Sequence, residues 1–170
     1  IKHWETPSKR RYKGRIVFRG DCVKDQDGHD VVFQELSASP TAIHSVNCNL
    51  AYGCIPGNKS TQADAIRAYV QAKLKSKSET WVRVPFELWP KDWKGRYKRP
   101  TCRLAKALYG HPEAGGHWEQ HLREALEAHG GEPVPNHPST YWFKESRLML
   151  SIYVDDLLLS GPADAHANFW

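Results

Sequence analysis

The clearest pattern along the chain is an apolar stretch near its end that two adjacent aspartates interrupt. Residues 147–154 and 157–160 are mostly apolar, and Asp155 and Asp156 lie between them. This pattern predicts two strands joined by a tight turn. Two carboxylates a few ångströms apart, beside apolar walls, disfavour joint ionisation. Because a divalent cation would offset that repulsion, the pattern points to metal-dependent phosphoryl transfer.

The rest of the chain mixes helical and strand patterns without strict alternation. Residues 40–53 predict a helix that Ser39 caps, with Ala42, Val46 and Leu50 along one face. Residues 112–129 predict an amphipathic helix. A helix is also expected at 65–75, a turn at 25–30, a loop at 87–100, and strands at 12–19, 59–63, 81–84, 101–105 and 141–143. This mixture predicts an α+β fold with a mainly antiparallel sheet.

Charge and cysteine content narrow the classes of function. The formal net charge is +5, and two stretches, 2–19 and 91–106, each hold seven Lys or Arg against one acid. Such stretches suit nucleic acid, or form a solvated basic face. The four cysteines form no Cys-x-x-Cys pair, which favours free thiols in the cytoplasm or nucleus. No apolar stretch is long enough to span a membrane, and the charged start predicts no signal peptide.

A metal site for phosphoryl transfer needs carboxylates from separate elements. Asp64 is the best second donor, because it follows the predicted strand 59–63 where a helix begins. Simpler roles stay open for each residue. Asp155 and Asp156 can form a plain turn, and Asp64 can cap a helix.

Four blocks, in order, resemble the reverse transcriptases of copia-type LTR retrotransposons. They are Lys13-Gly14-Arg15-Ile16-Val17, Gln62-Ala63-Asp64, Lys106-Ala107-Leu108-Tyr109-Gly110 with Trp118 downstream, and Tyr153-Val154-Asp155-Asp156. The last of these resembles the active-site box of reverse transcriptases. Together the blocks extend over nearly the whole chain, from about residue 12 to 161.

The resemblance implies catalytic roles for three carboxylates. Asp64 and Asp155 would be the principal ligands of Mg²⁺ or Mn²⁺, and Asp156 would support the site as a third carboxylate. The implied reaction is RNA-directed DNA polymerisation, in which two metal ions assist the transfer of a nucleotidyl group to a primer 3′-hydroxyl. The implied partners are an RNA or DNA primer–template and deoxynucleoside triphosphates.

The resemblance also implies a nucleotide-binding set. Tyr69 would be a steric gate against the 2′-hydroxyl, although a tyrosine there can also be core. The basic residues Lys13, Arg15 and Arg19 would neutralise the triphosphate, with the two arginines preferred. Glu113 stands where the family has a nucleotide-positioning glutamine, so we expect it to be paired with Lys106 or Arg103, or to serve the helix dipole.

The implied fold is the fingers and palm of a right-hand polymerase, without a thumb. Residues 1–60 would be fingers-like, 61–161 palm-like and 162–170 a short tail, in one compact unit. Because the chain lacks an initiator Met and a thumb, we expect the natural protein to continue on both sides. Two alternatives stay open: a non-catalytic retroelement-derived subunit of a larger protein assembly, and a generic basic RNA-binding module.

Overall fold

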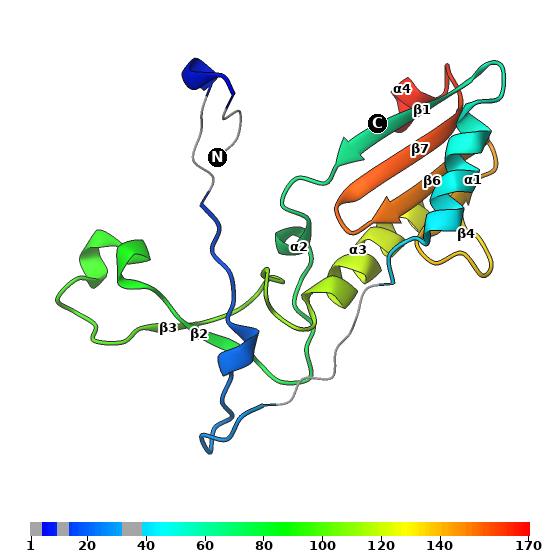
Figure 1. The fold of residues 1–170 in the computed structure, drawn as a ribbon. Helices are drawn as coiled ribbons and strands as arrows, with labels where there is room; N and C mark the ends of the chain where they lie inside the picture. Colours follow the sequence, from blue (N-terminus) through cyan, green and yellow to red (C-terminus); the bar gives the residue numbers. More distant parts are fainter. Residues whose placement is uncertain (1–4, 10–13, 32–38) are drawn as a thin grey trace.

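A five-stranded antiparallel sheet is the largest element of the computed structural model, which describes residues 5–9, 14–31 and 39–170 (Figure 1). The strands of this sheet lie in the order β1-β7-β6-β5-β4. Their bounds are β1 (Asn58–Asp64), β4 (Gly131–Pro133), β5 (Thr140–Phe143), β6 (Leu148–Tyr153) and β7 (Asp156–Pro162). A separate two-stranded ribbon pairs β2 (Trp81–Arg83) with β3 (Thr101–Arg103). The predicted α+β class and antiparallel sheet are confirmed.

Two longer helices cover opposite faces of the sheet. They are α1 (Ile43–Gly53) and α3 (Ala114–Ala128), and the described residues also form two single-turn helices, α2 (Ala68–Gln71) and α4 (His166–Phe169). Short 3₁₀ turns span Pro7–Lys9, Gly20–Cys22, Phe86–Leu88 and Lys91–Trp93. In the described part of the chain, none of the helices has the length and apolar character that crossing a bilayer requires.

The apolar core lies between the sheet and α3. Leu150 and Leu159 are neighbours across β6 and β7, and both are almost fully buried. Leu122 and Leu126 of α3 pack against them, as the predicted amphipathic pattern of this helix requires. Tyr141, Phe143, Leu148 and Ile152 complete the same cluster.

The opposite face of the sheet is polar where α1 covers it. Since successive side chains of a strand alternate, Ser151 points away from the leucine core. Asn49 of α1 is fully buried and donates from Nδ2 to Ser151 Oγ (2.9 Å) and to the carbonyl oxygen of Leu158 (3.0 Å). On the same helix, Ser45 Oγ lies 2.8 Å from His137 Nδ1.

This packing corrects the prediction for α1. The helix buries Ser45 and Asn49, whereas Leu50 of the predicted apolar face is 42% exposed. The cause is the sheet, whose facing side chains include the buried hydroxyls of Ser151, Ser160 and Thr140, which need hydrogen-bond partners. The predicted cap is also wrong, because the helix begins after Ala42 without a side-chain capping bond, and Ser39 donates its N–H to Glu119 instead.

Two other expected elements differ from the structure. The helix expected over 65–75 shrinks to α2, because Leu74 N–H donates to the Ala105 carbonyl oxygen and that segment is extended. The strand expected over 12–19 is absent from residues 14–19, where Phe18 N–H donates to the Tyr109 carbonyl oxygen. Residues 12 and 13 of that expected strand lie outside the described residues.

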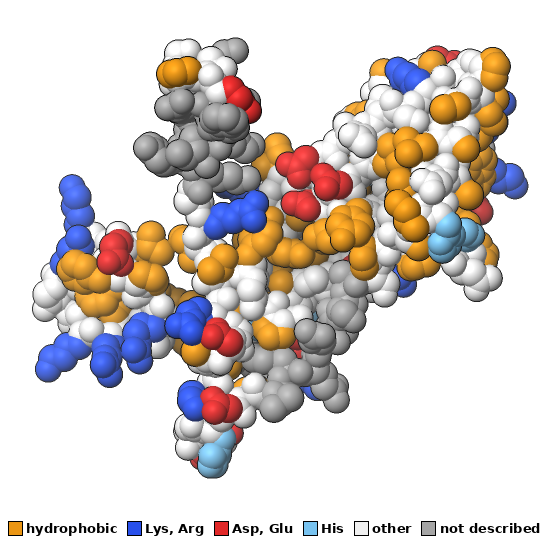
Figure 2. Space-filling view, viewed as in Figure 1, with side chains coloured by type: hydrophobic (Ala, Val, Ile, Leu, Met, Phe, Trp, Pro, Cys, Tyr) orange, Lys and Arg blue, Asp and Glu red, His pale blue; other side chains and the backbone are white. Residues whose placement is uncertain are grey.

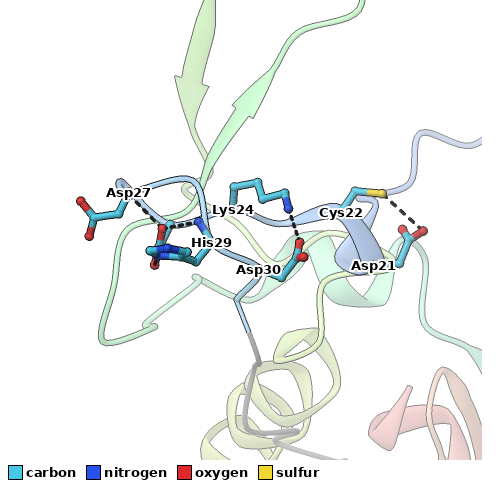
Figure 3. A network of polar contacts seen from close by, with 7 residues as sticks. Asp21, Cys22, Lys24, Asp27, His29 and Asp30 are labelled. Carbon is cyan, nitrogen blue, oxygen red and sulfur yellow. Dashed lines mark hydrogen bonds and ion pairs between the residues drawn. The ribbon is translucent and has the colours of Figure 1, made fainter.

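The turn predicted at 25–30 is confirmed (Figure 3). The Asp25 carboxylate accepts from the N–H groups of Asp27 and His29 (both 2.9 Å), and Gly28 takes a φ of 85°. Lys24 Nζ reaches Asp30 Oδ1 across the base of the turn (2.6 Å).

Candidate active site

The hairpin of β6 and β7 carries the acidic pair at its tip. Tyr153 and Asp156 form the last pair of the ladder, so the connecting turn has only two residues, Val154 and Asp155. Val154 has a φ of 59°, a left-handed conformation that costs a side chain of this kind roughly 1–2 kcal/mol. The predicted tight turn is confirmed, and it is strained.

Two hydrogen bonds from other elements hold this turn. Trp118 of α3 is 4% exposed, and its indole N–H donates to the Val154 carbonyl oxygen at 2.7 Å. On the other side, Ala65 N–H donates to the Asp155 carbonyl oxygen, also at 2.7 Å. The turn is therefore tied both to the helix behind the sheet and to the end of β1.

The ladder between β1 and β7 brings Asp64 to the same place. Asp64 is the register partner of Asp156. Directly opposed residues of an antiparallel pair have Cα atoms roughly 4.5–5.5 Å apart and side chains on one face. With Asp155 next in sequence, two separate elements supply carboxylates at one end of the sheet, where Figure 2 shows a group of acidic side chains.

The donor set suits a hard cation. Asp64 and Asp156 are exposed, Asp155 is half-buried, and no described residue forms an ion pair or a side-chain hydrogen bond with them. No three His, Cys, Asp or Glu side chains in the described ranges converge as a complete metal centre. Because Mg²⁺ usually takes one or two carboxylates and completes its shell with water and substrate oxygens, these residues fit it.

Tyr69 lies beside this acidic corner. Burial raises the pKa of the Tyr69 hydroxyl, and the nearby charges of Asp155 and Tyr109 raise it further. Its ring meets that of Tyr109 edge to face, with centroids 4.5 Å apart. The Arg15 guanidinium lies over the other ring, with Cζ 5.2 Å from the Tyr109 centroid. A cation therefore sits over the ring that adjoins Tyr69.

Of the other predicted phosphate ligands, Arg19 is paired with an acid and Lys13 is not described. The Arg19 guanidinium donates two hydrogen bonds to the Asp21 carboxylate, from Nη2 to Oδ2 (2.8 Å) and from Nε to Oδ1 (3.3 Å). These hydrogen bonds lower the pKa of that carboxyl. Both side chains are exposed, so the pair is open to solvent. Lys13 lies outside the described residues.

Glu113 is paired, but not with the predicted residues. Its carboxylate accepts from the Ser76 hydroxyl and lies 3.5 Å from His117 Nε2. The expected partners are engaged elsewhere: Lys106 Nζ donates to the Gln71 carbonyl oxygen, and Arg103 pairs with Glu79. The pairing with Lys106 or Arg103 is therefore wrong, because both bases find nearer acceptors.

Sequence reasoning missed two contributors to this site. The sequence singles out Trp118 and Tyr109 only as members of one family block and predicts no contact for either ring. Gly110, in the same block, has a φ of 88°, and a Cβ there would overlap the Phe18 carbonyl oxygen. The crossing of residues 18 and 110 brings the Arg15 segment against Tyr109, and the unbroken Leu108-Tyr109-Gly110 block was the available signal.

Comparison with known proteins adds an independent observation. The family model described as reverse transcriptase (RNA-dependent DNA polymerase) matches residues 2–167. The truncated transposon Ty1-A Gag-Pol polyprotein of Saccharomyces cerevisiae is 28% identical over 158 residues, which cover 92% of this chain and 12% of that protein. The transposon Ty1-DR5 Gag-Pol polyprotein from the same organism is also 28% identical over 92% of this chain, here 8% of the relative. No solved structure gives a significant match.

Proposed function

The chain belongs to the reverse transcriptase (RNA-dependent DNA polymerase) family, in its copia-type branch, and we propose that it carries the nucleotidyl-transfer centre of such an enzyme. It spans about a tenth of the length of the relatives it matches. The observation that carries the proposal is the β1–β7 register, which sets Asp64 opposite Asp156 and beside Asp155. A plain turn at Asp155 and Asp156, or a helix cap at Asp64, would not need these carboxylates to lie together. A shared cation would need it.

We extend the proposal to the fold. The five-stranded sheet with α1 and α3 corresponds to a palm, and the ribbon with residues 14–31 corresponds to fingers. This proposal differs from the expected division at residue 60, because α1, which precedes that residue, goes to the palm, the ribbon, which follows it, goes to the fingers, and β1 runs across it. Residues 162–170, proposed as a tail, include α4.

The reaction would be transfer of a nucleotidyl group to a primer 3′-hydroxyl. The 3′-oxygen bonds to the α-phosphorus of a deoxynucleotide, the bond to the bridging oxygen breaks, pyrophosphate leaves, and the hydroxyl proton passes to solvent. A bound pair of Mg²⁺ or Mn²⁺ ions would supply activation of the hydroxyl and charge stabilisation at the leaving group. Asp64 and Asp155 would hold them, and Asp156 would support the site.

Nucleotide selection would fall to the residues beside Asp155. The Tyr69 ring, which lies beside Asp155, would crowd a ribose 2′-hydroxyl. Arg15 is the best placed described cation for the triphosphate, because it already lies over the neighbouring Tyr109 ring. Arg19 would first have to leave Asp21, and Lys13 and Glu113 stay predictions.

The decisive experiment is primer extension on an RNA template with Mg²⁺ or Mn²⁺. Asp64→Asn and Asp155→Asn should each lower the rate by roughly a thousandfold or more, since they remove several kcal/mol of charge stabilisation. Asp164→Asn is the matched control, because that exposed aspartate follows the far end of β7. Extension that survives Asp155→Asn would refute the assigned centre.

A second measurement tests the metal site without turnover. Excess Mn²⁺ should raise the melting temperature of the wild type, because a ligand that binds only the native state stabilises it. The shift should vanish in Asp64→Asn and persist in Asp164→Asn. An equal shift in all three proteins would remove the proposed cation site.

The alternative role, a non-catalytic subunit of a larger protein assembly, rests on the outer face of α1. Ile43 is 74% exposed and Leu50 42% exposed, and Figure 2 shows hydrophobic side chains over this part of the molecule. Exposed apolar patches are common at protein interfaces. A chain that purifies only in a stoichiometric complex, with no metal-induced stabilisation, would favour this role.

A further inference from the structure

Two histidines from separate elements meet where α1 begins. His44 lies in the first turn of α1, and His137 lies in the connection between β4 and β5. Their ring centroids are 5.3 Å apart, with an interplanar angle of 63°. His44 is exposed and His137 is half-buried, and Figure 2 shows histidine on the surface where α1 begins. Neither residue has a part in the candidate active site, so the pair needs an explanation of its own.

His137 is held in place by its backbone and by its ring. Its backbone N–H donates to the Val134 carbonyl oxygen (3.1 Å), which closes a turn that contains Pro135 and is followed by Pro138. On the ring, Nδ1 lies 2.8 Å from Oγ of the fully buried Ser45. When Nδ1 carries the proton, it donates to that hydroxyl oxygen and leaves a lone pair on Nε2. A hydrogen bond of this kind, at the nitrogen that does not bind the ion, orients histidines in metal sites.

The separation of the two rings fits two ligands on one ion. An imidazole nitrogen binds Zn²⁺ at roughly 2.0–2.1 Å, so two imidazoles on one tetrahedral ion have ring centres roughly 5 Å apart. The 5.3 Å between the centroids of His44 and His137 agrees with this value. An edge-to-face packing contact falls in the same range. The neighbouring residues therefore have to distinguish a metal site from packing.

Cys48 offers a third donor beside the pair. It follows His44 by four residues on α1, so the two side chains lie on one side of the helix with Cβ atoms roughly 5–6 Å apart. Helical side chains tilt toward the N-terminus, which directs Cys48 toward His44. The described side chains do not converge as a three-ligand centre, so the thiol has to change rotamer when an ion binds. Because Cys48 is free and exposed, core packing does not hold its thiol in place.

We propose that His44, Cys48 and His137 form a Zn²⁺ site, separate from the acidic corner at Asp64 and Asp155. Two imidazole nitrogens and a thiolate are ligands that Zn²⁺ prefers, and a water molecule would complete the tetrahedral shell. Carboxylates alone, as at the acidic corner, suit Mg²⁺ instead. The two sites would therefore select different classes of cation. The Zn²⁺ ion would join the start of α1 to the β4–β5 connection and stabilise the folded chain.

A Co²⁺ titration of the full, metal-free chain tests the proposal. The thiols are kept reduced, and excess Mg²⁺ competes at the acidic corner. Co²⁺ accepts the same nitrogen and sulfur ligands as Zn²⁺. It reports them by absorption, because a bonded thiolate gives a charge-transfer band and a tetrahedral ion gives visible bands. The wild type should show both signals at a single equivalent of Co²⁺, and added Zn²⁺ should abolish them. A chain that shows neither signal would overturn the proposal.

Single substitutions assign the ligands. His44→Gln and His137→Gln should each weaken Co²⁺ binding at least about tenfold, since even the loss of an outer-shell partner costs roughly 10- to 100-fold. Cys48→Ser should remove the charge-transfer band. The matched controls are His29→Gln, at an exposed histidine in the 25–30 turn, and Cys54→Ser, at the exposed cysteine that follows α1. Both controls should behave like the wild type. A band that survives Cys48→Ser, or equal losses in ligand and control variants, would overturn the proposal.

Thermal unfolding separates this site from packing and from catalysis. Excess Zn²⁺ should raise the melting temperature of the wild type but not of His137→Gln, because an ion that binds only the native state stabilises it. In EDTA, His44→Gln should melt like the wild type, which shows that the variant is folded. Asp64→Asn should keep the Co²⁺ spectrum, so a failure of primer extension and a failure of this site can be distinguished. A Zn²⁺ shift that depends on Asp64 and not on His137 would assign the ion to the acidic corner and refute the site on α1.

Discussion

Trp118→Phe isolates the contact that holds the strained turn. The substitution keeps an aromatic ring in the buried position on α3 but removes the N–H that donates to the Val154 carbonyl oxygen. That carbonyl belongs to a residue with a φ of 59°, a conformation that needs external support. The change therefore tests whether α3 helps to fix the Asp155 turn.

The expected magnitude follows from the geometry. Leaving a buried acceptor without its partner costs roughly 1–3 kcal/mol, and the upper part of that range does not apply because this contact is only partly buried. We expect a loss of about 1–2 kcal/mol in unfolding free energy, or about 2–8 °C in melting temperature for a chain of this size. Once this hydrogen bond is lost, the turn should change conformation, because that change releases the strain of roughly 1–2 kcal/mol at Val154.

Thermal unfolding with and without Mn²⁺ measures both consequences. Beyond the stability loss, Trp118→Phe should weaken the Mn²⁺-induced shift, since a relaxed turn reorients the Asp155 carboxylate. Trp89→Phe is the matched control, because it also removes an indole bond to a backbone carbonyl, but in the ribbon. A Trp118→Phe protein with the full Mn²⁺ shift would show that this bond does not position the site.

Three further predictions concern the rest of the fold. Asn49→Ala should lower the unfolding free energy by about 2–3 kcal/mol, because it leaves the buried Ser151 hydroxyl and Leu158 carbonyl without this hydrogen-bond donor. The control Asn47→Ala, at an exposed position of the same helix, should change the unfolding free energy by less than about 0.5 kcal/mol. Arg147→Gly should raise the melting temperature by about 2–4 °C, because Arg147 has a φ of 54°, while Lys144→Gly in the same turn should lower it. Burial lowers the pKa of His111 below its ordinary 6.5. As the pH falls, the unfolded chain therefore binds this proton at a higher pH than the folded chain does. The unfolding free energy should then decrease as the pH drops below about 6.5. Chemical denaturation from pH 8 to 5 should show a shallower decline for His111→Gln, and equal slopes would contradict this assignment.

Local patterns predicted the sheet meander and α3 because both depend on neighbouring residues. The apolar runs predicted at 147–154 and 157–160 correspond to β6 and β7, and Leu122 and Leu126 pack as the helical period requires. The helix at 65–75 failed for the opposite reason. In its second half Leu74 bonds to Ala105, about thirty residues further along the chain, and local propensity carries no information about that partner.

The candidate site was predictable only where a motif carried it. The blocks around Asp64 and Asp155 named the carboxylates, and the β1–β7 ladder agrees with them. The inner face of α1 could not be predicted, since polar Ser45 and Asn49 face a sheet surface that is itself polar. The bond from Trp118 was equally hidden, because it depends on the left-handed backbone of Val154.

The β1–β7 ladder limits how this chain can vary in length. Side chains alternate between the two faces of a sheet, so one inserted residue between positions 58 and 64 would turn Asp64 toward the leucine core. A pair of inserted residues would restore the side but move the carboxylate along the strand by roughly 6–7 Å, beyond reach of a cation shared with the hairpin. We therefore expect insertions and deletions among related chains to fall between α2 and β2, or in the connection of the ribbon, and to spare β1.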